Sequence, residues 1–293
     1  MGRELAEKDR QFMDLWKKAE KISSYPLREI FWDGNDQDMS KTEFLQPALT
    51  VVNLNLWRFL EHRLKPEFMT GHSLGEFSAL CAAKVISTKQ AIELVSLRGR
   101  LMAESGKDSQ GAMAAILKVK QSDVEEITRE VSLKTDQILI VANYNTPKQF
   151  VVSGNVEAIE ALEALVKEAR GRLVKLPVSG AFHSPLMNEA ARELSKLMDK
   201  VEWKTPFCRL FFNSTTKAEH DPEKIKKIMQ KQMISPVYFF QIVQDMYQQG
   251  ATTFVEIGPK GVLSRMIPQI LGPDKVREIN IGSSEEDHKL ADA

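Results

Sequence analysis

Residues 71–77 read Gly-His-Ser-Leu-Gly-Glu-Phe, and this stretch constrains the fold more than any other part of the chain. The seven residues before it are typical of a short buried strand, and residues 77–84 place small and apolar side chains at helical spacing. The Gly-x-Ser-x-Gly pattern centred on Ser73 therefore lies where a strand turns sharply into a helix. We expect Gly71 and Gly75 to leave room for the turn and for close packing of helix on strand. The alternative is a chance match in an ordinary turn.

In a turn of this kind Ser73 is pushed out at the N-terminus of the following helix. Free backbone N–H groups and the positive end of the helix dipole favour a developing oxyanion at that position. The pattern therefore predicts a nucleophilic serine, and the rest of the chain has to supply a base that activates it.

Length and charge exclude several classes of protein. The chain has 293 residues, enough for one large domain or two smaller ones, and its 40 basic and 40 acidic residues favour neither nucleic acid nor a membrane surface. We expect no signal peptide and no membrane span, because no sufficiently long apolar run occurs. Cys81 and Cys208 are expected to be reduced core residues of a cytoplasmic protein, and no Cys/His cluster suggests a metal site.

Apolar periodicity predicts helices on both sides of the elbow. Residues 3–20 indicate an amphipathic surface helix, residues 42–63 a long helix, and residues 87–104 a further helix that carries Arg98. Towards the C-terminus we expect strands at 208–213 and 253–257, helices at 186–201, 222–232, 239–249 and 262–271, and a frayed polar tail at 283–293.

The middle of the chain has a different order of elements. Strands are predicted at 112–119, 138–143, 149–153 and 172–176, with helices at 121–131 and 156–169 between them. The order strand-helix-strand-strand-helix-strand is typical of a ferredoxin-like unit. We therefore predict an α/β protein. Residues 1–110 and 177–293 form a large α/β-hydrolase-like domain with a parallel sheet, and residues 111–176 form an inserted ferredoxin-like small domain.

Five histidines are candidates for the base that Ser73 requires. His62 lies among charged residues of a helix, His220 in a hydrophilic loop and His288 in the polar tail. His72 lies inside the elbow and points elsewhere if Ser73 points into the site. His183, in a loop bounded by glycine and proline, is left by elimination, although a loop histidine taken alone is more often structural.

Several motifs of the chain resemble those of a known family. Gly71-His-Ser-Leu-Gly-Glu76 is similar to the nucleophile motif of malonyl-CoA:acyl-carrier-protein transacylases and of polyketide-synthase acyltransferase domains, including free-standing ones. The likeness extends along almost the whole chain. The matching motifs are Gln46-Pro-Ala48, Arg98-Gly99, Gly111-Ala-Met-Ala-Ala115, Asn143-Tyr-Asn-Thr-Pro147, Gly180-Ala-Phe-His-Ser184, Gln232-Met-Ile-Ser-Pro-Val237 and Glu256-Ile-Gly-Pro259.

The resemblance implies a ping-pong transfer of a malonyl group, in fatty acid or polyketide synthesis. Ser73, activated by His183, would take the malonyl group from malonyl-CoA and pass it to the phosphopantetheine thiol of an acyl carrier protein. The resemblance also makes the N–H of Leu74 an oxyanion donor and the backbone carbonyl of Gln232 the partner of the imidazole. It implies a monomer without cofactor or metal.

The resemblance assigns the remaining site residues to substrate binding. Arg98 would clamp the free carboxylate of malonyl, since a guanidinium binds carboxylate bidentately; without the family match, an ordinary surface ion pair is the better interpretation. Phe182 belongs to the Ala-Phe-His version of its loop, which is typical of malonyl rather than methylmalonyl types. Gln46 and His72, in the family's motifs, complete the predicted set.

The sequence departs from the family pattern at two places. The family begins with a buried strand and a Gly-Gln-Gly-Ser-Gln loop whose first Gln donates an oxyanion N–H. Met1-Gly-Arg-Glu-Leu5 resembles the helix that follows this loop. We expect an in-frame Gly-Gln-Gly-Ser-Gln upstream of Met1; the alternative is a truncated, weakened homologue. The second departure is Gly258-Pro-Lys-Gly261, where the family usually reads Gly-Pro-Gly-Lys.

Three other functions compete with malonyl transfer. An acyl-carrier-protein hydrolase is disfavoured by Arg98, which such relatives lack. A lipase or esterase is disfavoured because His183 lies mid-chain, whereas the histidine of those enzymes usually lies near the C-terminus. A non-catalytic carrier-protein-binding homologue is supported only by the N-terminal departure.

Overall fold

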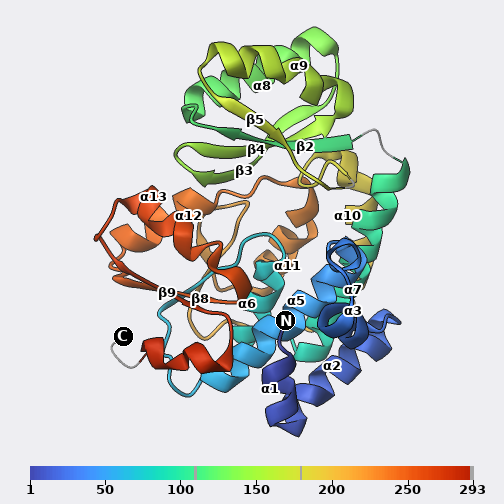
Figure 1. The fold of residues 1–293 in the computed structure, drawn as a ribbon, viewed down its shortest axis with the longest axis vertical. Coiled ribbons are helices and arrows are strands. Elements are labelled where there is room, and N and C mark those ends of the chain that lie inside the picture. The colour runs from blue at the N-terminus through green and yellow to red at the C-terminus, as the bar shows by residue number, and fades with distance from the viewer. Residues whose placement is uncertain (109–110, 179, 291–293) are drawn as a thin grey trace.

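The chain folds into a mixed α/β architecture, in which a four-stranded sheet covered by two helices lies above a larger, mainly helical part (Figure 1). The structure is a computed structural model that describes residues 1–108, 111–178 and 180–290. Within these residues no helix is both long enough and apolar enough to cross a membrane.

The N-terminal region supplies most of the helices of the larger part. They are α1 (Arg3–Lys8), α2 (Arg10–Ser23), α3 (Leu27–Asp33), α4 (Asp36–Met39), α5 (Thr42–Leu60), α6 (Gly75–Ala82) and α7 (Thr88–Asp108), with strand β1 (Phe68–Met69) before α6. The single helix predicted over 3–20 is wrong, because the chain is extended at Asp9, whose carboxylate accepts from the Gln11 N–H and caps α2. The apolar face of α2 is buried through Phe12 and Trp16.

The upper part consists of six consecutive elements. They are β2 (Gly111–Leu117), α8 (Gln121–Thr135), β3 (Leu139–Thr146), β4 (Gln149–Asn155), α9 (Val156–Glu168) and β5 (Arg172–Lys175). The strands lie in the order β3-β4-β2-β5 and all neighbouring pairs are antiparallel. A separate apolar core, including Ile116, Phe150 and Leu162, holds the helices on this sheet.

The C-terminal region returns to the larger part. Its elements are η1 (Pro185–Met187), α10 (Asn188–Met198), β6 (Arg209–Phe211), β7 (Ala218–Glu219), α11 (Pro222–Gln230), η2 (Gln232–Ile234), α12 (Phe239–Gln248), β8 (Thr253–Ile257), η3 (Pro259–Gly261), η4 (Ser264–Met266), α13 (Ile267–Leu271), β9 (Arg277–Ile281) and η5 (Ser284–Leu290). Sequence periodicity missed β7 and β9, which are a two-residue strand and a short, partly charged one.

The parallel sheet predicted for the larger part is present as two separate pieces. One sheet has the order β1-β6-β7, with β1 and β6 parallel and β6 and β7 antiparallel. The other is the parallel pair of β8 and β9. The expectation that the strand before the elbow is buried is wrong, because Phe68 and Met69 are only half-buried. Their exposure follows from a groove that runs beside β1.

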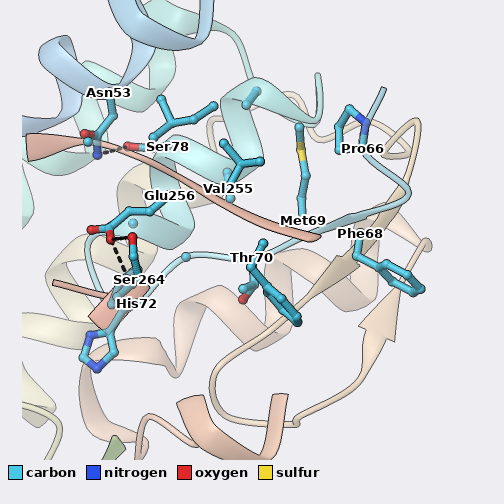
Figure 2. A pocket seen from close by; sticks show the side chains of 18 of the residues that line it. Asn53, Pro66, Phe68, Met69, Thr70, His72, Ser78, Val255, Glu256 and Ser264 are labelled. Atoms are coloured by element: carbon cyan, nitrogen blue, oxygen red, sulfur yellow. Dashed lines mark hydrogen bonds between the residues drawn. The ribbon is translucent and has the colours of Figure 1, made fainter. Parts of the chain in front are cut away.

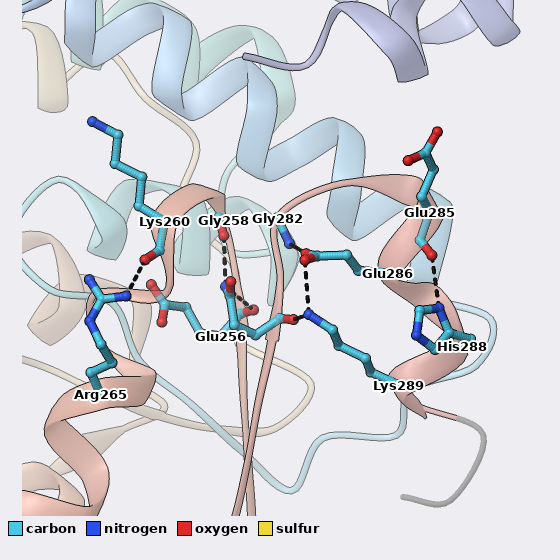
Figure 3. A network of polar contacts seen from close by, with 10 residues as sticks. Glu256, Gly258, Lys260, Arg265, Gly282, Glu285, Glu286, His288 and Lys289 are labelled. Carbon is cyan, nitrogen blue, oxygen red and sulfur yellow. Dashed lines mark hydrogen bonds and ion pairs between the residues drawn. The ribbon is translucent and has the colours of Figure 1, made fainter.

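The C-terminal segment is packed, so the prediction of a frayed tail is wrong for residues 284–290. A network of polar contacts closes the end of the β8–β9 sheet (Figure 3). The Gly282 N–H donates to the Glu286 carboxylate over 2.6 Å, and Asp287 pairs with Arg63 of the loop before β1 at 2.7 Å. Leu290 is buried, which fixes η5 against the rest of the fold.

The order of lysine and glycine in Gly258-Pro-Lys-Gly261 has a consequence for stability, since the motif that it resembles usually reads Gly-Pro-Gly-Lys. Lys260 is exposed and has φ 76°, a left-handed conformation that costs an L-residue about 1 kcal/mol. We therefore expect Lys260→Gly to raise the free energy of unfolding by up to ~1 kcal/mol, less the entropy that glycine adds to the unfolded chain. Urea denaturation at neutral pH measures this change.

Gly261→Ala is the matched control. Gly261 has φ +57°, and a Cβ there would lie 3.1 Å from Asn280 Oδ1. Alanine should therefore lower stability by about 1–2 kcal/mol. A stability loss in Lys260→Gly as large as that in Gly261→Ala would contradict the assignment of strain to Lys260.

Candidate active site

The elbow places Ser73 between β1 and α6 in a strained backbone conformation, with φ 50°. Gly71 is required there, because a Cβ on it would lie 1.9 Å from the carbonyl carbon of Gly75. The expectation that Gly75 also needs to be glycine for space is wrong, since a Cβ on Gly75 meets nothing within 4 Å. Of the two glycines, only Gly71 therefore makes a tight approach.

His183 is brought to the nucleophile by the loop that follows the small sheet. Its Nε2 lies 2.7 Å from Ser73 Oγ. Its Nδ1 lies 3.1 Å from the carbonyl oxygen of Gln232 and 3.0 Å from that of Ser235. Because carbonyls only accept, Nδ1 carries the proton and Nε2 is free to accept the serine hydroxyl hydrogen. The two residues that the sequence separates by 110 positions thus have the geometry of a nucleophile–base pair.

The protonation state of His183 suits a base. The imidazole is buried, and burial together with the charge of Arg98 and neighbouring His72 lowers its pKa to about 3. His183 is therefore neutral throughout the physiological range. A proton taken from Ser73 makes an imidazolium whose only stabilising partners among the described residues are the two backbone carbonyls.

Arg98 lies in the same cluster and is only 1% exposed. From α7 its Nη2 donates to Ser73 Oγ over 3.1 Å, and its Nη1 donates to Gln46 Oε1 over 2.8 Å. Its Nε donates to Gln232 Oε1 over 3.3 Å. Burial lowers the pKa of Arg98 to about 10, so the guanidinium keeps its charge at neutral pH. The structure places a buried positive charge beside the nucleophile.

Glu76 supplies the opposite charge. It belongs to the elbow motif, but the motif alone indicated no role for its side chain. It is 2% exposed and accepts from the Asn213 backbone N–H over 2.8 Å and from Gln232 Nε2 over 3.1 Å. Burial raises its pKa to about 7, while these hydrogen bonds and Arg98 oppose the shift. Gln232 therefore connects Arg98 to Glu76 through its two side-chain atoms and holds His183 through its carbonyl.

Asn213 is a further residue that sequence reasoning missed. Its Oδ1 accepts from the Ser73 N–H over 2.7 Å, and its Nδ2 donates to the Gly71 carbonyl over 2.7 Å. Both bonds lock the elbow to the end of β6. The sequence could have indicated this residue, because Asn213 ends the strand predicted over 208–213 and functional sites form at the carboxyl ends of parallel strands.

His72 and Leu74, the two neighbours of Ser73 in the chain, have different surroundings. His72 lies across the elbow from His183, with its Nε2 2.8 Å from Asn145 Oδ1 of β3 and its ring against Phe239. It connects the elbow to the small sheet and does not contact Ser73 Oγ. The N–H of Leu74, at the start of α6, donates to no group among the described residues. It is therefore free to donate to an oxyanion.

Apolar side chains cover one side of the buried site. Phe182 lies with Met102, Met187 and Met233 beside Arg98 and His183, and the space that they enclose is too small for a water molecule. Methionine side chains are flexible, so this side of the site can rearrange around a bound group. Within the described ranges, no group of three or more His, Cys, Asp or Glu side chains is arranged to hold a metal ion.

Comparison with known proteins gives one family. The chain matches the profile of the acyl transferase domain over residues 1–291. It is 34% identical over 272 residues to the malonyl CoA-acyl carrier protein transacylase of Bacillus subtilis, a match that covers 92% of this chain and 86% of the relative. The enzyme of the same name from Staphylococcus aureus strain MW2 is 36% identical over 271 residues, with 92% and 87% covered.

Solved structures agree with the sequence matches. An acyl carrier protein S-malonyltransferase from Vibrio cholerae superposes with a TM-score of 0.91 at 32% identity, covering 98% of this chain and 93% of that one. A malonyl-transacylase solved in complex with a type II PKS acyl-carrier protein gives 0.92 at 31% identity, with 99% and 94% covered.

Proposed function

The chain belongs to the acyl transferase domain family, within the malonyl-CoA:acyl-carrier-protein transacylases, and from this premise we propose that it transfers malonyl from malonyl-CoA to an acyl carrier protein. The observation that carries the proposal is the position of Arg98. A buried guanidinium 3.1 Å from the nucleophilic oxygen suits an acyl group that ends in a carboxylate. A simple acetyl group would offer this guanidinium no carboxylate.

The geometry supports a two-step reaction. Ser73 Oγ gives its proton to His183 Nε2 and attacks the thioester carbon, and the oxyanion is held by the Leu74 N–H. The C–S bond then breaks, and the CoA thiolate takes the proton from His183. In the second half the carrier protein's phosphopantetheine thiol gives its proton to His183 and attacks the malonyl-serine ester. The C–O bond of the ester then breaks, and Ser73 Oγ takes the proton back from His183.

The contacts of Arg98 suggest how the substrate enters. When a malonyl carboxylate arrives, Nη2 and Nη1 can turn from Ser73 Oγ and Gln46 to the two carboxylate oxygens. Gln232 holds the Nε and so keeps the guanidinium in place. Phe182, beside Arg98 and the base, would crowd an α-methyl group and so favour malonyl over methylmalonyl.

We extend the proposal to the organisation of the molecule. Residues 111–176 are a ferredoxin-like small domain inserted into a large α/β-hydrolase-like domain of residues 1–110 and 177–293. The hydrogen bond of His72 to Asn145 crosses between them next to the nucleophile. Because the nucleophile lies beside this junction, we propose that the phosphopantetheine arm of the carrier protein reaches it there and that the working unit is a cytoplasmic monomer.

Intact-mass measurement tests the proposal. We expect malonyl-CoA to leave a malonyl adduct on Ser73 that an added acyl carrier protein removes. Rapid release of acetate from acetyl-loaded carrier protein without a malonyl adduct would instead indicate a hydrolase. No adduct with malonyl-CoA, acetyl-CoA or acyl-loaded carrier protein would indicate a non-catalytic homologue.

The titration of Glu76 gives a pH-dependence. Its pKa of about 7 means that raising the pH from 6 to 8 ionises Glu76 while Arg98 and neutral His183 stay unchanged. An ionised Glu76 competes with the malonyl carboxylate for the charge of Arg98. We therefore expect the KM for malonyl-CoA in acyl-enzyme formation to rise about 3- to 10-fold between pH 6 and 8.

Two controls accompany this measurement. Acetyl-CoA carries the same phosphates as malonyl-CoA but no acyl carboxylate, so its KM should change much less. Glu76→Gln removes the titrating group and should flatten the malonyl-CoA profile. A profile that stays steep in Glu76→Gln would assign the effect to another group.

A further inference from the structure

Asn213 lies two residues after β6 and is 1% exposed, and each of its polar groups makes a hydrogen bond. Its side chain bonds to the elbow, through Oδ1 to the Ser73 N–H and through Nδ2 to the Gly71 carbonyl, each over 2.7 Å. Its backbone N–H donates to the Glu76 carboxylate over 2.8 Å, and its backbone carbonyl accepts from the Tyr238 N–H over 3.0 Å. Asn213 therefore contacts both the elbow and the segment before α12.

The backbone of Ser73 is held by two side-chain amides. Ser73 has φ 50°, a left-handed conformation that is unfavourable for an L-residue. Asn213 Oδ1 accepts from its N–H, and Gln232 Nε2 donates to its carbonyl over 2.9 Å. Because strained conformations persist only where the surrounding structure holds them, these two amides keep Ser73 Oγ in its direction.

The chain that leads into the elbow is also held from β6. It passes Thr70 and His72 along the groove beside β1 (Figure 2). Thr70 Oγ1 donates to the carbonyl of Phe211, the last residue of β6, over 3.2 Å. Together with the two bonds of the Asn213 side chain, this contact makes the end of β6 the reference for the position of the nucleophile.

The base takes its position from the same residue. The Tyr238 N–H donates to the Asn213 carbonyl, and Ser235, three residues earlier, provides a carbonyl 3.0 Å from His183 Nδ1. Between them, Val237 pairs with β3 through two backbone hydrogen bonds of 2.8 Å. The segment that holds His183 is thus fixed both by β3 and by Asn213.

We propose that Asn213 is a positioning residue, which fixes Ser73 Oγ and His183 Nε2 at the distance over which the proton is transferred. Its side chain holds the nucleophile and its backbone holds the segment of the base, so one residue sets both. The inference rests on the proposed function, since it takes Ser73 and His183 as a reacting pair. A misplacement of reacting groups by about 1 Å can lower a rate about 10²-fold.

Substitutions at position 213 test the side chain by itself, because every residue except proline keeps the backbone N–H and carbonyl. In Asn213→Ala we expect the maximal rate of acyl-enzyme formation from malonyl-CoA, followed by intact mass after rapid quenching, to fall about 10²-fold. The malonyl-CoA concentration that gives half of this rate should change less than about 3-fold. The reason is that Arg98 makes no hydrogen bond to Asn213 among the described residues.

Methanesulfonyl fluoride tests the same pair without CoA or a carrier protein. Ser73 Oγ displaces fluoride from the sulfur of this small neutral reagent, and His183 takes the hydroxyl proton. We expect Asn213→Ala to slow the appearance of sulfonylated protein, measured by intact mass, about 10²-fold. A wild-type protein that reacts with this reagent but takes up no malonyl contradicts the proposed function alone, and the variants still decide the role of Asn213.

Asn213→Asp keeps the shape of the side chain and adds a signature that depends on pH. A protonated carboxyl accepts from the Ser73 N–H and donates to the Gly71 carbonyl, as the amide does, whereas a carboxylate only accepts and is repelled by that carbonyl. Relative to wild-type protein, the sulfonylation rate should be within about 3-fold at about pH 5.5 and lowered at least ~10-fold at about pH 8.5, because burial raises the pKa of a carboxyl. The titratable and charged groups on the surrounding elements occur in both proteins, so this ratio removes their own titration; they are His72, Glu76, Arg98, His183, Lys217 and Tyr238.

Asn188 of α10 is exposed and supplies the matched controls. Asn188→Ala and Asn188→Asp should react at wild-type rates at both pH values. Asn213 variants that unfold at a lower temperature but keep wild-type rates would show a purely structural role and overturn the inference. So would a loss in Asn213→Asp that is equal at both pH values, because it would indicate a disturbed fold.

Discussion

Ser73→Ala should abolish the malonyl adduct and lower transacylation on the order of 10⁶-fold, because it removes the hydroxyl that lies beside His183 and Arg98. His183→Ala should fall to a similar level, since a nucleophile and its base act as one unit and their losses do not add. Intact mass after incubation with malonyl-CoA measures the adduct, and transfer to the carrier protein measures the rate.

The control for this experiment is Ser122→Ala, which removes an exposed serine hydroxyl on α8. It should keep both the adduct and the full rate. A malonyl adduct that persists in Ser73→Ala, located by peptide mapping on another residue, would contradict the assignment of the nucleophile.

Arg98→Ala should reverse the preference between acyl groups. The variant loses the only guanidinium in contact with Ser73 Oγ among the described residues, so we expect kcat/KM for malonyl-CoA to fall about 10³-fold. The value for acetyl-CoA should change far less or rise, because the cavity that alanine leaves is neutral. The ratio of the two kcat/KM values is therefore the decisive measurement.

Arg98 also contributes to packing, so its variants need a structural control. Arg98→Gln keeps a hydrogen-bonding side chain near Gln46 and Gln232 but has no charge, and it should show the same change of preference. Arg100→Ala removes an exposed arginine from the same helix and should leave the ratio unchanged. An unchanged ratio in both Arg98 variants, with the fold intact by circular dichroism, would exclude the carboxylate clamp.

The sequence predicted candidates for the reacting groups but not the groups that hold them. Ser73 was proposed from a turn motif and Arg98 from a resemblance to a family motif, and each of these signals lies in residues that are neighbours in the chain. Asn213 and Glu76 act through hydrogen bonds whose partners lie 137 to 156 positions away in the chain. Such contacts exist only once β6 lies beside β1, so no local pattern reports them.

The pairing of the strands also depends on contacts between segments that lie far apart in the chain. The apolar residues Phe254, Val255 and Ile257 indicated a strand at 253–257, and the structure has β8 at those residues. The sequence did not indicate that β1 and β8 each have one unpaired edge among the described residues. Pairing depends on which segment occupies the space between two strands, and periodicity within each strand carries no information about its neighbour.

The acceptors that hold His183 are main-chain carbonyls of residues 232 and 235, where many serine enzymes use a carboxylate side chain. A point substitution can delete a carboxylate, but it cannot delete a carbonyl that every amino acid carries. The hydrogen bonds that hold His183 are therefore insensitive to which amino acids occupy positions 232 and 235. They are sensitive to the path of the backbone between α11 and α12. Alanine scanning would overlook them, whereas a one-residue insertion between α11 and α12 would remove them. At Ser235, whose carbonyl and not whose side chain holds the imidazole, sequence drift should be tolerated more readily over evolutionary time than a change of length.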